Sequence, residues 1–174
     1  MTELDDSSLD LSPALGTEGT ARVLADARGR GLAVEIVERP EAGSLDDAAA
    51  LLGLRPRDIV KSLVVKRHDG SFLFALVPGD RQISWAKLRA VVGVNKLSMP
   101  SADVALEATG YERGTITPLG STTAWPVYAD ERIVGLRVAL GAGAHGRSAF
   151  VDADALIAAY GATVADVTDP IAPR

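Results

Sequence analysis

The chain of 174 residues has no cysteine and only two histidines. The missing thiols exclude disulfides, cysteine nucleophiles and cysteine-ligated zinc, and two imidazoles are too few for a histidine-rich metal cluster. No uncharged apolar run approaches the roughly 20 residues that span a bilayer, and the acidic N-terminus lacks the basic and apolar regions of a secretory signal. These absences predict a soluble, cytoplasmic protein with no bound metal and no contact with a membrane.

Charge is unevenly distributed along the chain. Residues 1–20 hold five acidic and no basic residues, so the net charge of −5 belongs to that segment and the remainder is neutral overall. Residues 55–96, in contrast, hold nine Lys and Arg against three Asp. A basic zone on a neutral body indicates either an anionic partner such as RNA or an ordinary solvated surface. Charge alone does not choose between these interpretations.

Apolar periodicity, capping residues and turn residues predict short helices and short strands that are interspersed. Helices are expected over residues 19–30, 45–52, 83–92, 102–108 and 152–160, and strands over residues 33–37, 58–65, 72–77, 126–129, 134–140, 149–151 and 163–167. The links between strands are mostly short. This favours a mixed α+β sheet over a doubly wound parallel one.

The strand expected over residues 58–65 carries one lysine, Lys61, near its start. A His-Asp-Gly turn separates it from the strand over 72–77, so the two are expected to form a hairpin. Lys61 is either an outward-facing, solubilising charge or an ammonium directed into a pocket. Because side chains alternate along a strand, Lys61 shares its face with Ile59 and Leu63, and it points inward if those two face the core.

Two glycine-containing segments are candidates for contact with a substrate. In Gly114-Thr115-Ile116-Thr117-Pro118 the terminal glycine and proline can hold the backbone rigidly and turn N–H groups toward a ligand, although an ordinary tight connection has the same composition. Gly141-Ala142-Gly143-Ala144-His145-Gly146 lacks the Lys-Ser/Thr of a phosphate-binding P-loop. Its glycines indicate either a close approach of the backbone to a substrate or a simple turn. His145 has no nearby Ser and Asp pattern that would support a catalytic triad.

Five short motifs follow one another in a specific order and spacing. They are Ile59-Val60-Lys61-Ser62-Leu63-Val64-Val65, then Val77-Pro78-Gly79-Asp80, then Thr109-Gly110-Tyr111 just before Gly114-Thr115-Ile116-Thr117-Pro118, then Val127-Tyr128-Ala129-Asp130, and finally Gly141-Ala142-Gly143. Together they resemble the YbaK/ProX family of aminoacyl-tRNA deacylases, which is related to the editing domain of bacterial prolyl-tRNA synthetases. The resemblance covers roughly residues 20–168.

The resemblance implies hydrolysis of the ester that joins a wrong amino acid to the 3′ end of a tRNA, which is post-transfer editing. It implies that Lys61 holds the 3′-terminal adenosine or phosphate, and that the backbone at Gly114 holds the aminoacyl end and helps to activate water. The other candidate substrate-binding residues are Thr115, Ile116, Pro118, Gly141, Ala142, Gly143 and His145. An aminoacyl ester is already labile, so positioned water and one stabilised negative charge are sufficient. No metal, cofactor, thiol or triad is therefore expected.

The resemblance also sets the expected fold, domain and partners. The fold class is α+β, a single domain with a mixed, mostly antiparallel central sheet that is strongly curved or barrel-like and has flanking helices. The deacylase domain is placed at residues 19–169, between a flexible acidic tail (1–18) and a C-terminal tail (170–174). The expected partner is the 3′ acceptor end of tRNA, with prolyl-tRNA synthetase as a further candidate.

The chain departs from the family pattern at two places. Some members have a serine where this chain has Gly141, and members with a histidine after the first strand are matched here by Glu38 or Arg39. These positions belong to the pocket that selects the amino acid, so the sequence does not identify the amino acid that is removed. Removal of Cys or Ala from prolyl tRNA is the commonest activity in the family. Two other hypotheses remain open, namely a non-catalytic tRNA-binding or synthetase-associated module and a hydrolase of small aminoacyl esters unrelated to tRNA.

Overall fold

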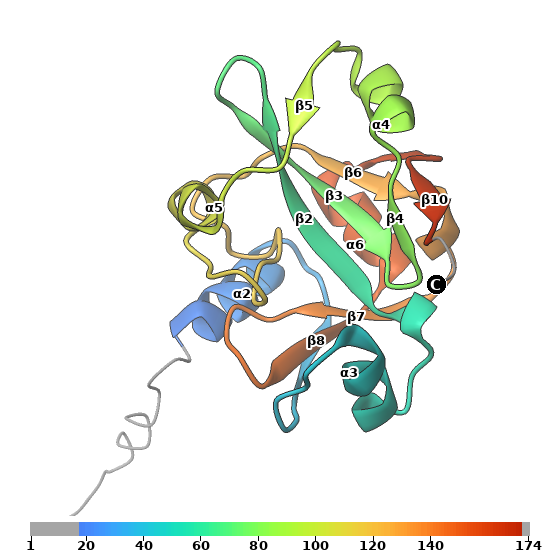
Figure 1. Cartoon of the computed structure of the whole chain (residues 1–174). Helices are drawn as coiled ribbons and strands as arrows, with labels where there is room; N and C mark the ends of the chain where they lie inside the picture. Colours follow the sequence, from blue (N-terminus) through green and yellow to red (C-terminus); the bar gives the residue numbers. More distant parts are fainter. Residues whose placement is uncertain (1–17, 172–174) are drawn as a thin grey trace, which may run out of the picture.

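The computed structural model describes residues 18–171, which form five α-helices, two short 3-10 helices and ten strands (Figure 1). In chain order these are α2 (Glu18–Gly29), β1 (Val34–Glu38), α3 (Leu45–Leu52), η2 (Pro56–Asp58), β2 (Val60–Arg67), β3 (Phe72–Pro78), β4 (Arg81–Ile83), α4 (Trp85–Val92), β5 (Leu97–Ser98), α5 (Ala102–Thr109), β6 (Val127–Asp130), η3 (Glu131–Ile133), β7 (Arg137–Gly141), β8 (Arg147–Asp152), α6 (Ala153–Tyr160), β9 (Thr163–Ala165) and β10 (Thr168–Pro170). No helix among these has the length and apolarity needed to cross a membrane. The expected N-terminal tail lies outside the described residues except for Glu18, and of the expected C-terminal tail only Pro170 and Ile171 are described.

The strands divide into three sheets with the orders β5-β2-β3-β6-β9, β1-β8-β7 and β4-β10. The expected mixed α+β architecture is confirmed, and five of the seven strand pairs are antiparallel. The five-stranded sheet itself is not mostly antiparallel, because its pairs β3–β6 and β6–β9 are parallel. The expected strongly curved or barrel-like sheet is not supported, because none of the three sheets closes on itself. The five-stranded and three-stranded sheets meet at one isolated bridge, Ile59 with Ala139, and there is no continuous ladder between them.

The hairpin of β2 and β3 has apolar packing on both of its faces. Along β2, Val60 and Val64 belong to the larger core cluster, whereas Val65 belongs to a second cluster. The strand register pairs Val64 with Phe74 and Val65 with Leu73, and each pair lies in one cluster. Because successive side chains of a strand point to opposite faces, a hairpin packed on both sides gives a nearly continuous apolar run.

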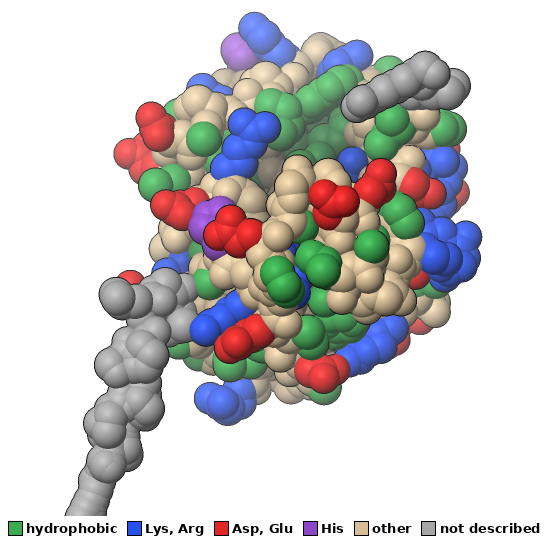
Figure 2. All heavy atoms as spheres, turned by 60° about the horizontal axis from the view of Figure 1, so that its bottom comes forward, with side chains coloured by type: hydrophobic (Ala, Val, Ile, Leu, Met, Phe, Trp, Pro, Cys, Tyr) green, Lys and Arg blue, Asp and Glu red, His purple; other side chains and the backbone are tan. Residues whose placement is uncertain are grey.

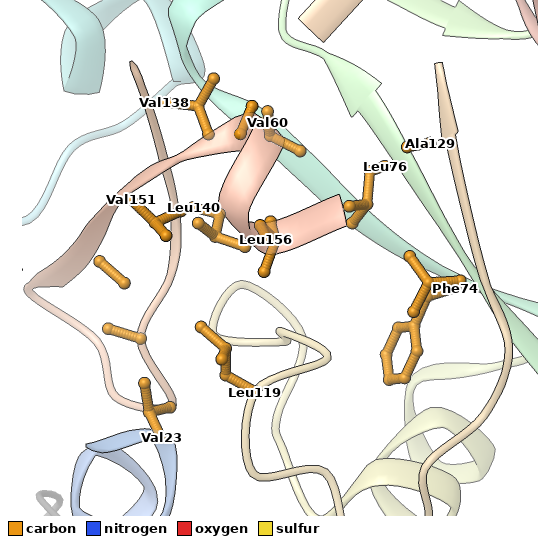
Figure 3. Close-up of a cluster of buried hydrophobic side chains, with 14 of the residues drawn as sticks. Val23, Val60, Phe74, Leu76, Leu119, Ala129, Val138, Leu140, Val151 and Leu156 are labelled. Carbon is orange, nitrogen blue, oxygen red and sulfur yellow. The ribbon is translucent and has the colours of Figure 1, made fainter. Parts of the chain in front are cut away.

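The larger cluster joins the two main sheets to helices α2 and α6. Figure 3 shows Val60 from β2 and Leu76 from β3 in the same cluster as Val138 and Leu140 from β7. Leu156 of α6 is 1% exposed and packs among them. Burial of this contiguous apolar surface is the main term that holds the β7–β8 ribbon against the five-stranded sheet.

Helix boundaries follow the capping residues of the sequence. The Ser44 side chain accepts a hydrogen bond from the Asp47 amide, and Ser101 accepts one from Val104, as expected for N-caps. Helix α3 has the expected bounds, whereas α4 begins at Trp85 because Ser84 caps it. The short strands β4, β5 and β10 were not predicted, since two or three residues give no alternation to detect.

Candidate active site

A cavity of about 660 Å³ lies between the start of β2 and the end of β7, and residues of α3 and α5 complete its wall. The wall is mostly apolar, and five alanines line it (Ala42, Ala48, Ala102, Ala105 and Ala139). Lys61 and Gly114, the two residues expected to act on the substrate, both line this cavity, as do Ile116 and Gly141. The volume suits a ligand of the size of a nucleoside or an amino acid.

Lys61 is half-buried on β2, with its backbone paired to Val77 of β3. Its face of the strand is shared with Leu63 and Val65, which belong to or pack against the second core cluster. Lys61 is therefore not an outward-facing charge. Its Nζ donates a hydrogen bond to the carbonyl oxygen of Arg81, at the turn between β3 and β4.

The environment of Lys61 disfavours its charged form. Burial lowers the pKa of the Lys61 ammonium from its usual value, and the nearby Asp80 carboxylate opposes that shift. An ammonium has three N–H donors, so the single bond to Arg81 leaves two for another acceptor. Lys61 therefore lines the cavity and carries an ammonium with two N–H donors that no other described residue uses.

The segment 112–118 forms a tight turn at Gly114. Gly114 has a φ of 93°, a conformation that a residue with a side chain rarely adopts, which explains the glycine. The amide and hydroxyl of Thr115 both donate to the carbonyl oxygen of Glu112, at 2.9 and 2.8 Å. Within residues 18–171 no backbone oxygen accepts a hydrogen bond from the amides of Gly114 and Ile116. Both residues line the cavity, and their amides have no backbone acceptor among the described residues.

The two glycine-containing segments pack directly against one another. A β-carbon on Gly141 would overlap the carbonyl oxygen of Ile116 and would lie 2.9 Å from that of Thr115. The Gly143 amide donates to the same Thr115 carbonyl at 3.0 Å. The close approach explains the glycine at position 141, where some members of the resembling family have serine.

The remaining candidate residues lie beside this cavity. Thr115, Gly143 and His145 line a second, shallower hollow. The side chain of His145 is 55% exposed, and its Nε2 lies 3.2 Å from Oε1 of Glu112. Pro118 and Ala142 are buried and line neither hollow. Pro118 and Ala142 therefore support the two glycine-containing segments structurally.

Helix α2 anchors the segment that follows Gly114. The Arg22 guanidinium donates to the carbonyl oxygens of Gly120 and Gly110, at 3.1 and 3.2 Å. The Asp26 carboxylate accepts hydrogen bonds from the Gly120 amide and from the Tyr160 hydroxyl. Burial would raise the pKa of Asp26, but the hydrogen bonds from Tyr160, Gly120 and Arg30 outweigh burial and lower it. The ionised carboxylate is the form that holds this loop.

Sequence reasoning missed Arg113 and Arg147 at the cavity, and it connected Arg39 with the pocket only as an alternative to Glu38. Arg39, Arg113 and Arg147 line it together with Lys61, and no Asp or Glu does. Of the nine basic residues in the segment 55–96, only Lys61 reaches this cavity, so the basic zone of the sequence is not the site. A usable signal was present, since Arg113 directly precedes Gly114 and Arg147 directly follows the glycine-rich segment. Among residues 18–171, no group of three or more His, Asp or Glu residues could hold a metal ion.

Comparison with curated proteins finds proline–tRNA ligases. The ligase of Thermosipho africanus is 41% identical over 88 residues, which are 51% of this chain and 16% of the ligase. That of Bacillus velezensis is 27% identical over 132 residues, which are 74% of this chain and 23% of the ligase. The chain therefore spans less than a quarter of the length of these relatives.

Solved structures give a likeness over nearly the whole fold. A candidate trans-editing enzyme for prolyl tRNA synthetase is 29% identical with a TM-score of 0.81, and the match covers 87% of this chain and 98% of that one. A hypothetical protein of known structure is 26% identical with a TM-score of 0.80, over 85% of this chain and 99% of that one. Residues 39–159 match the family described as the aminoacyl-tRNA editing domain. Because this match spans more than half of the sequence, the chain belongs to the aminoacyl-tRNA editing domain family.

Proposed function

We propose that the protein is a trans-acting, cytoplasmic deacylase that hydrolyses the ester of a mischarged tRNA. The observation that carries the proposal is that Lys61 and the Gly114 turn line one cavity of about 660 Å³. Membership of the aminoacyl-tRNA editing domain family supports the same chemistry. Ligation of proline is no part of the proposal, since the chain corresponds to a small fraction of the ligases that it matches.

In this proposal Lys61 is an electrostatic anchor. Its ammonium donates to the Arg81 carbonyl and keeps two further donors for the 3′-terminal adenosine or its phosphate. A half-buried charge attracts an anion more strongly than a fully solvated one, because less water screens it. Lys61 is placed to bind and orient the substrate, and no attack by its nitrogen is invoked.

The Gly114 turn supplies the second half of the mechanism. The amides of Gly114 and Ile116 have no backbone acceptor within residues 18–171, so they are available to a carbonyl oxygen or to a water molecule. Attack of water on the ester carbonyl places negative charge on the carbonyl oxygen, and preorganised N–H donors stabilise that charge. The bond between the carbonyl carbon and the ribose oxygen then breaks, and the ribose oxygen takes up the proton that the water loses. The free amino acid and the tRNA 3′ hydroxyl are the products.

The amino acid removed is proposed to be small, with Cys or Ala on prolyl tRNA as the first candidates. The cavity wall is mostly apolar and includes five alanines and four serines, so it suits a side chain of low polarity. The proline–tRNA ligase relatives and the candidate trans-editing neighbour make prolyl tRNA the first tRNA to test. Prolyl-tRNA synthetase is the corresponding candidate partner.

A deacylation screen tests the proposal. Purified protein is incubated with a panel of mischarged tRNAs and, alongside, with free aminoacyl esters, and the released amino acid is measured. We expect release from at least one mischarged tRNA, abolition by Lys61→Ala, and no effect of Lys66→Ala, which alters an exposed lysine on the same strand outside the cavity. Binding of tRNA without cleavage would instead indicate a non-catalytic module, and cleavage of free esters alone a hydrolase unrelated to tRNA.

A further inference from the structure

Three arginines converge on the cavity that holds Lys61. Arg39 follows β1 and Arg147 begins β8, and these strands pair so that Glu38 lies opposite Arg147 and the Arg39 amide donates to the Gly146 carbonyl at 2.9 Å. Arg113 comes from the separate turn that contains Gly114. Tertiary structure thus brings two strand ends and one turn together around one cavity, which the three arginines and Lys61 all line.

These charges are weakly neutralised. Arg39 is hydrogen-bonded to the Ser148 hydroxyl at 3.2 Å and to the Pro40 carbonyl, neither of which carries charge. No side-chain hydrogen bond or ion pair links Arg113 to another of residues 18–171. Arg147 contacts Glu38 at 3.5 Å, and the Glu38 side chain is 77% exposed, so this pair contributes little and can open.

Several basic side chains elsewhere in the fold have closer acidic partners. Lys87 lies 3.0 Å from Asp166 and 3.2 Å from Asp169, and Arg132 lies 2.9 Å from Asp166. Figure 2 shows that acidic and basic side chains are interspersed over the face that it presents. Four basic residues and no acidic residue line the cavity, which distinguishes it from this mixed surface. A bound anion would relieve the mutual repulsion of the four positive charges.

We propose that Arg39, Arg113 and Arg147 form a cationic rim that binds backbone phosphates of the single-stranded 3′ end of tRNA. The inference rests on the proposed function and adds the residues that hold the nucleotides before the terminal adenosine. A cavity of about 660 Å³ takes one aminoacylated nucleoside, so the preceding nucleotides must leave across its rim. A guanidinium can donate two parallel hydrogen bonds to a phosphate, which makes arginine the suitable residue there.

A substrate with backbone phosphates and a substrate without them distinguish the role of the rim from that of the catalytic cavity. We compare wild type, the single Arg→Gln variants at positions 39, 113 and 147, and their triple combination. The control is Arg28→Gln, which changes an exposed arginine of α2 that lines neither hollow. Hydrolysis is measured on mischarged tRNA and on the 3′-aminoacyl ester of adenosine, which has no backbone phosphate. We expect the triple variant to raise KM for the tRNA at least tenfold with kcat nearly unchanged. KM for the adenosine ester should rise far less, so that the ratio of the two KM changes measures the contacts to backbone phosphates.

Binding of uncharged tRNA and of a short single-stranded RNA ending in CCA is measured over a range of salt concentrations, so the rim can be judged without catalysis. Each phosphate contact to a single strand contributes about 0.7 to the slope of log Kd against log salt, so loss of three contacts should reduce the slope by about 2. A triple variant with the wild-type affinity and slope would overturn the rim. Weakened binding of free AMP with unchanged binding of both RNAs would overturn it as well. Absence of hydrolysis by the wild type would overturn the proposed function and would leave the binding result to decide on the rim.

Folding of the variants is checked by thermal unfolding. Arg113 is exposed and makes no side-chain hydrogen bond with another of residues 18–171, so Arg113→Gln should fold as wild type does. Arg39→Lys keeps the charge but loses the planar guanidinium, which can donate two parallel hydrogen bonds to one phosphate. We expect this variant to bind RNA more weakly than wild type does and to keep most of the slope of log Kd against log salt.

Discussion

The carbonyl oxygen of Ile116 occupies the space that a β-carbon on Gly141 would need. Two segments separated by some 25 residues of sequence are therefore in backbone contact, and the Gly143 amide fixes the contact through its bond to Thr115. The position of the Gly114 turn in the cavity depends on this absence of a side chain.

Gly141→Ala should displace the Gly114 turn. The added methyl group would push against backbone that cannot rotate away, so we expect the free energy of unfolding to fall by about 1–3 kcal/mol. Deacylation should fall by about 100-fold, because a shift of one ångström at reacting groups has an effect of that size. Urea unfolding and a single-turnover assay measure the two effects. Gly29→Ala is the matched control, since nothing lies within 4 Å of its β-carbon position, and a wild-type activity for Gly141→Ala would contradict the stated contact.

Lys61→Met should remove activity without loss of stability. Burial lowers the pKa of Lys61, so the folded state holds this proton less tightly than the unfolded state does. Below its folded pKa, the protonated lysine therefore lowers the free energy of unfolding. This destabilisation disappears as the pH rises through the usual pKa of 10.5. We expect the variant to be at least as stable as wild type at pH 7, with the difference shrinking as the pH rises toward 10.5. A variant that is markedly less stable at pH 7 would show that Lys61 supports the fold.

Asp26→Asn should reduce the stability of the protein at neutral pH and much less in acid. The pKa of Asp26 in the folded state is lowered, so its contribution is present above the unfolded value of 3.8 and is lost as the pH falls through the folded pKa. The difference between wild type and variant, measured by urea unfolding, should therefore be constant from pH 5 to pH 7 and should fade below pH 4. Because Asp26 holds Gly120, kcat should also decrease modestly. A difference that does not change with pH would contradict the role of the ionised carboxylate.

Asp130→Ala should be strongly destabilising without affecting the cavity. The Asp130 side chain has no exposed surface, accepts hydrogen bonds from the Val167 amide and the Thr168 hydroxyl, and pairs with Arg132. Removal of one partner from a buried charged network costs about 3–5 kcal/mol. Glu107→Ala, on the exposed side of α5, should change stability by less than about 0.5 kcal/mol. KM at a temperature where both variants are folded should match wild type, and an altered KM would indicate coupling to the site.

Ser62→Ala should leave the protein as stable as wild type or slightly more stable. Its hydroxyl oxygen is buried next to Lys61 and has no hydrogen-bond partner among the described residues. Removal of an unsatisfied hydroxyl is neutral or favourable by up to about 1 kcal/mol. Thermal unfolding and the deacylation assay should both give wild-type values. A loss of activity with retained stability would instead assign the hydroxyl to substrate or water.

Local features of the fold were predictable from the sequence because their causes are local. The hairpin of β2 and β3 follows from two apolar runs around a turn, and the caps at Ser44 and Ser101 follow from side chains that reach an amide three residues ahead. The lysine strand and the Gly114 turn were likewise recognisable as motifs. Within the site, Lys61, Gly114, Ile116 and Gly141 were predicted together and line one cavity.

The division into three sheets could not be read from the sequence, because strand pairing depends on contacts between residues far apart in the chain. Glu38 and Arg147 are neighbours only after β1 has paired with β8, and no periodicity records that register. The same pairing brings Arg39 and Arg147 of the arginine rim together, and Arg113 joins them from a separate turn. The sequence by itself determined the individual strands, caps and chemical groups. Only the tertiary structure decided which charges share a cavity, since nonlocal packing places the β7–β8 ribbon, and with it the rim, beside Lys61.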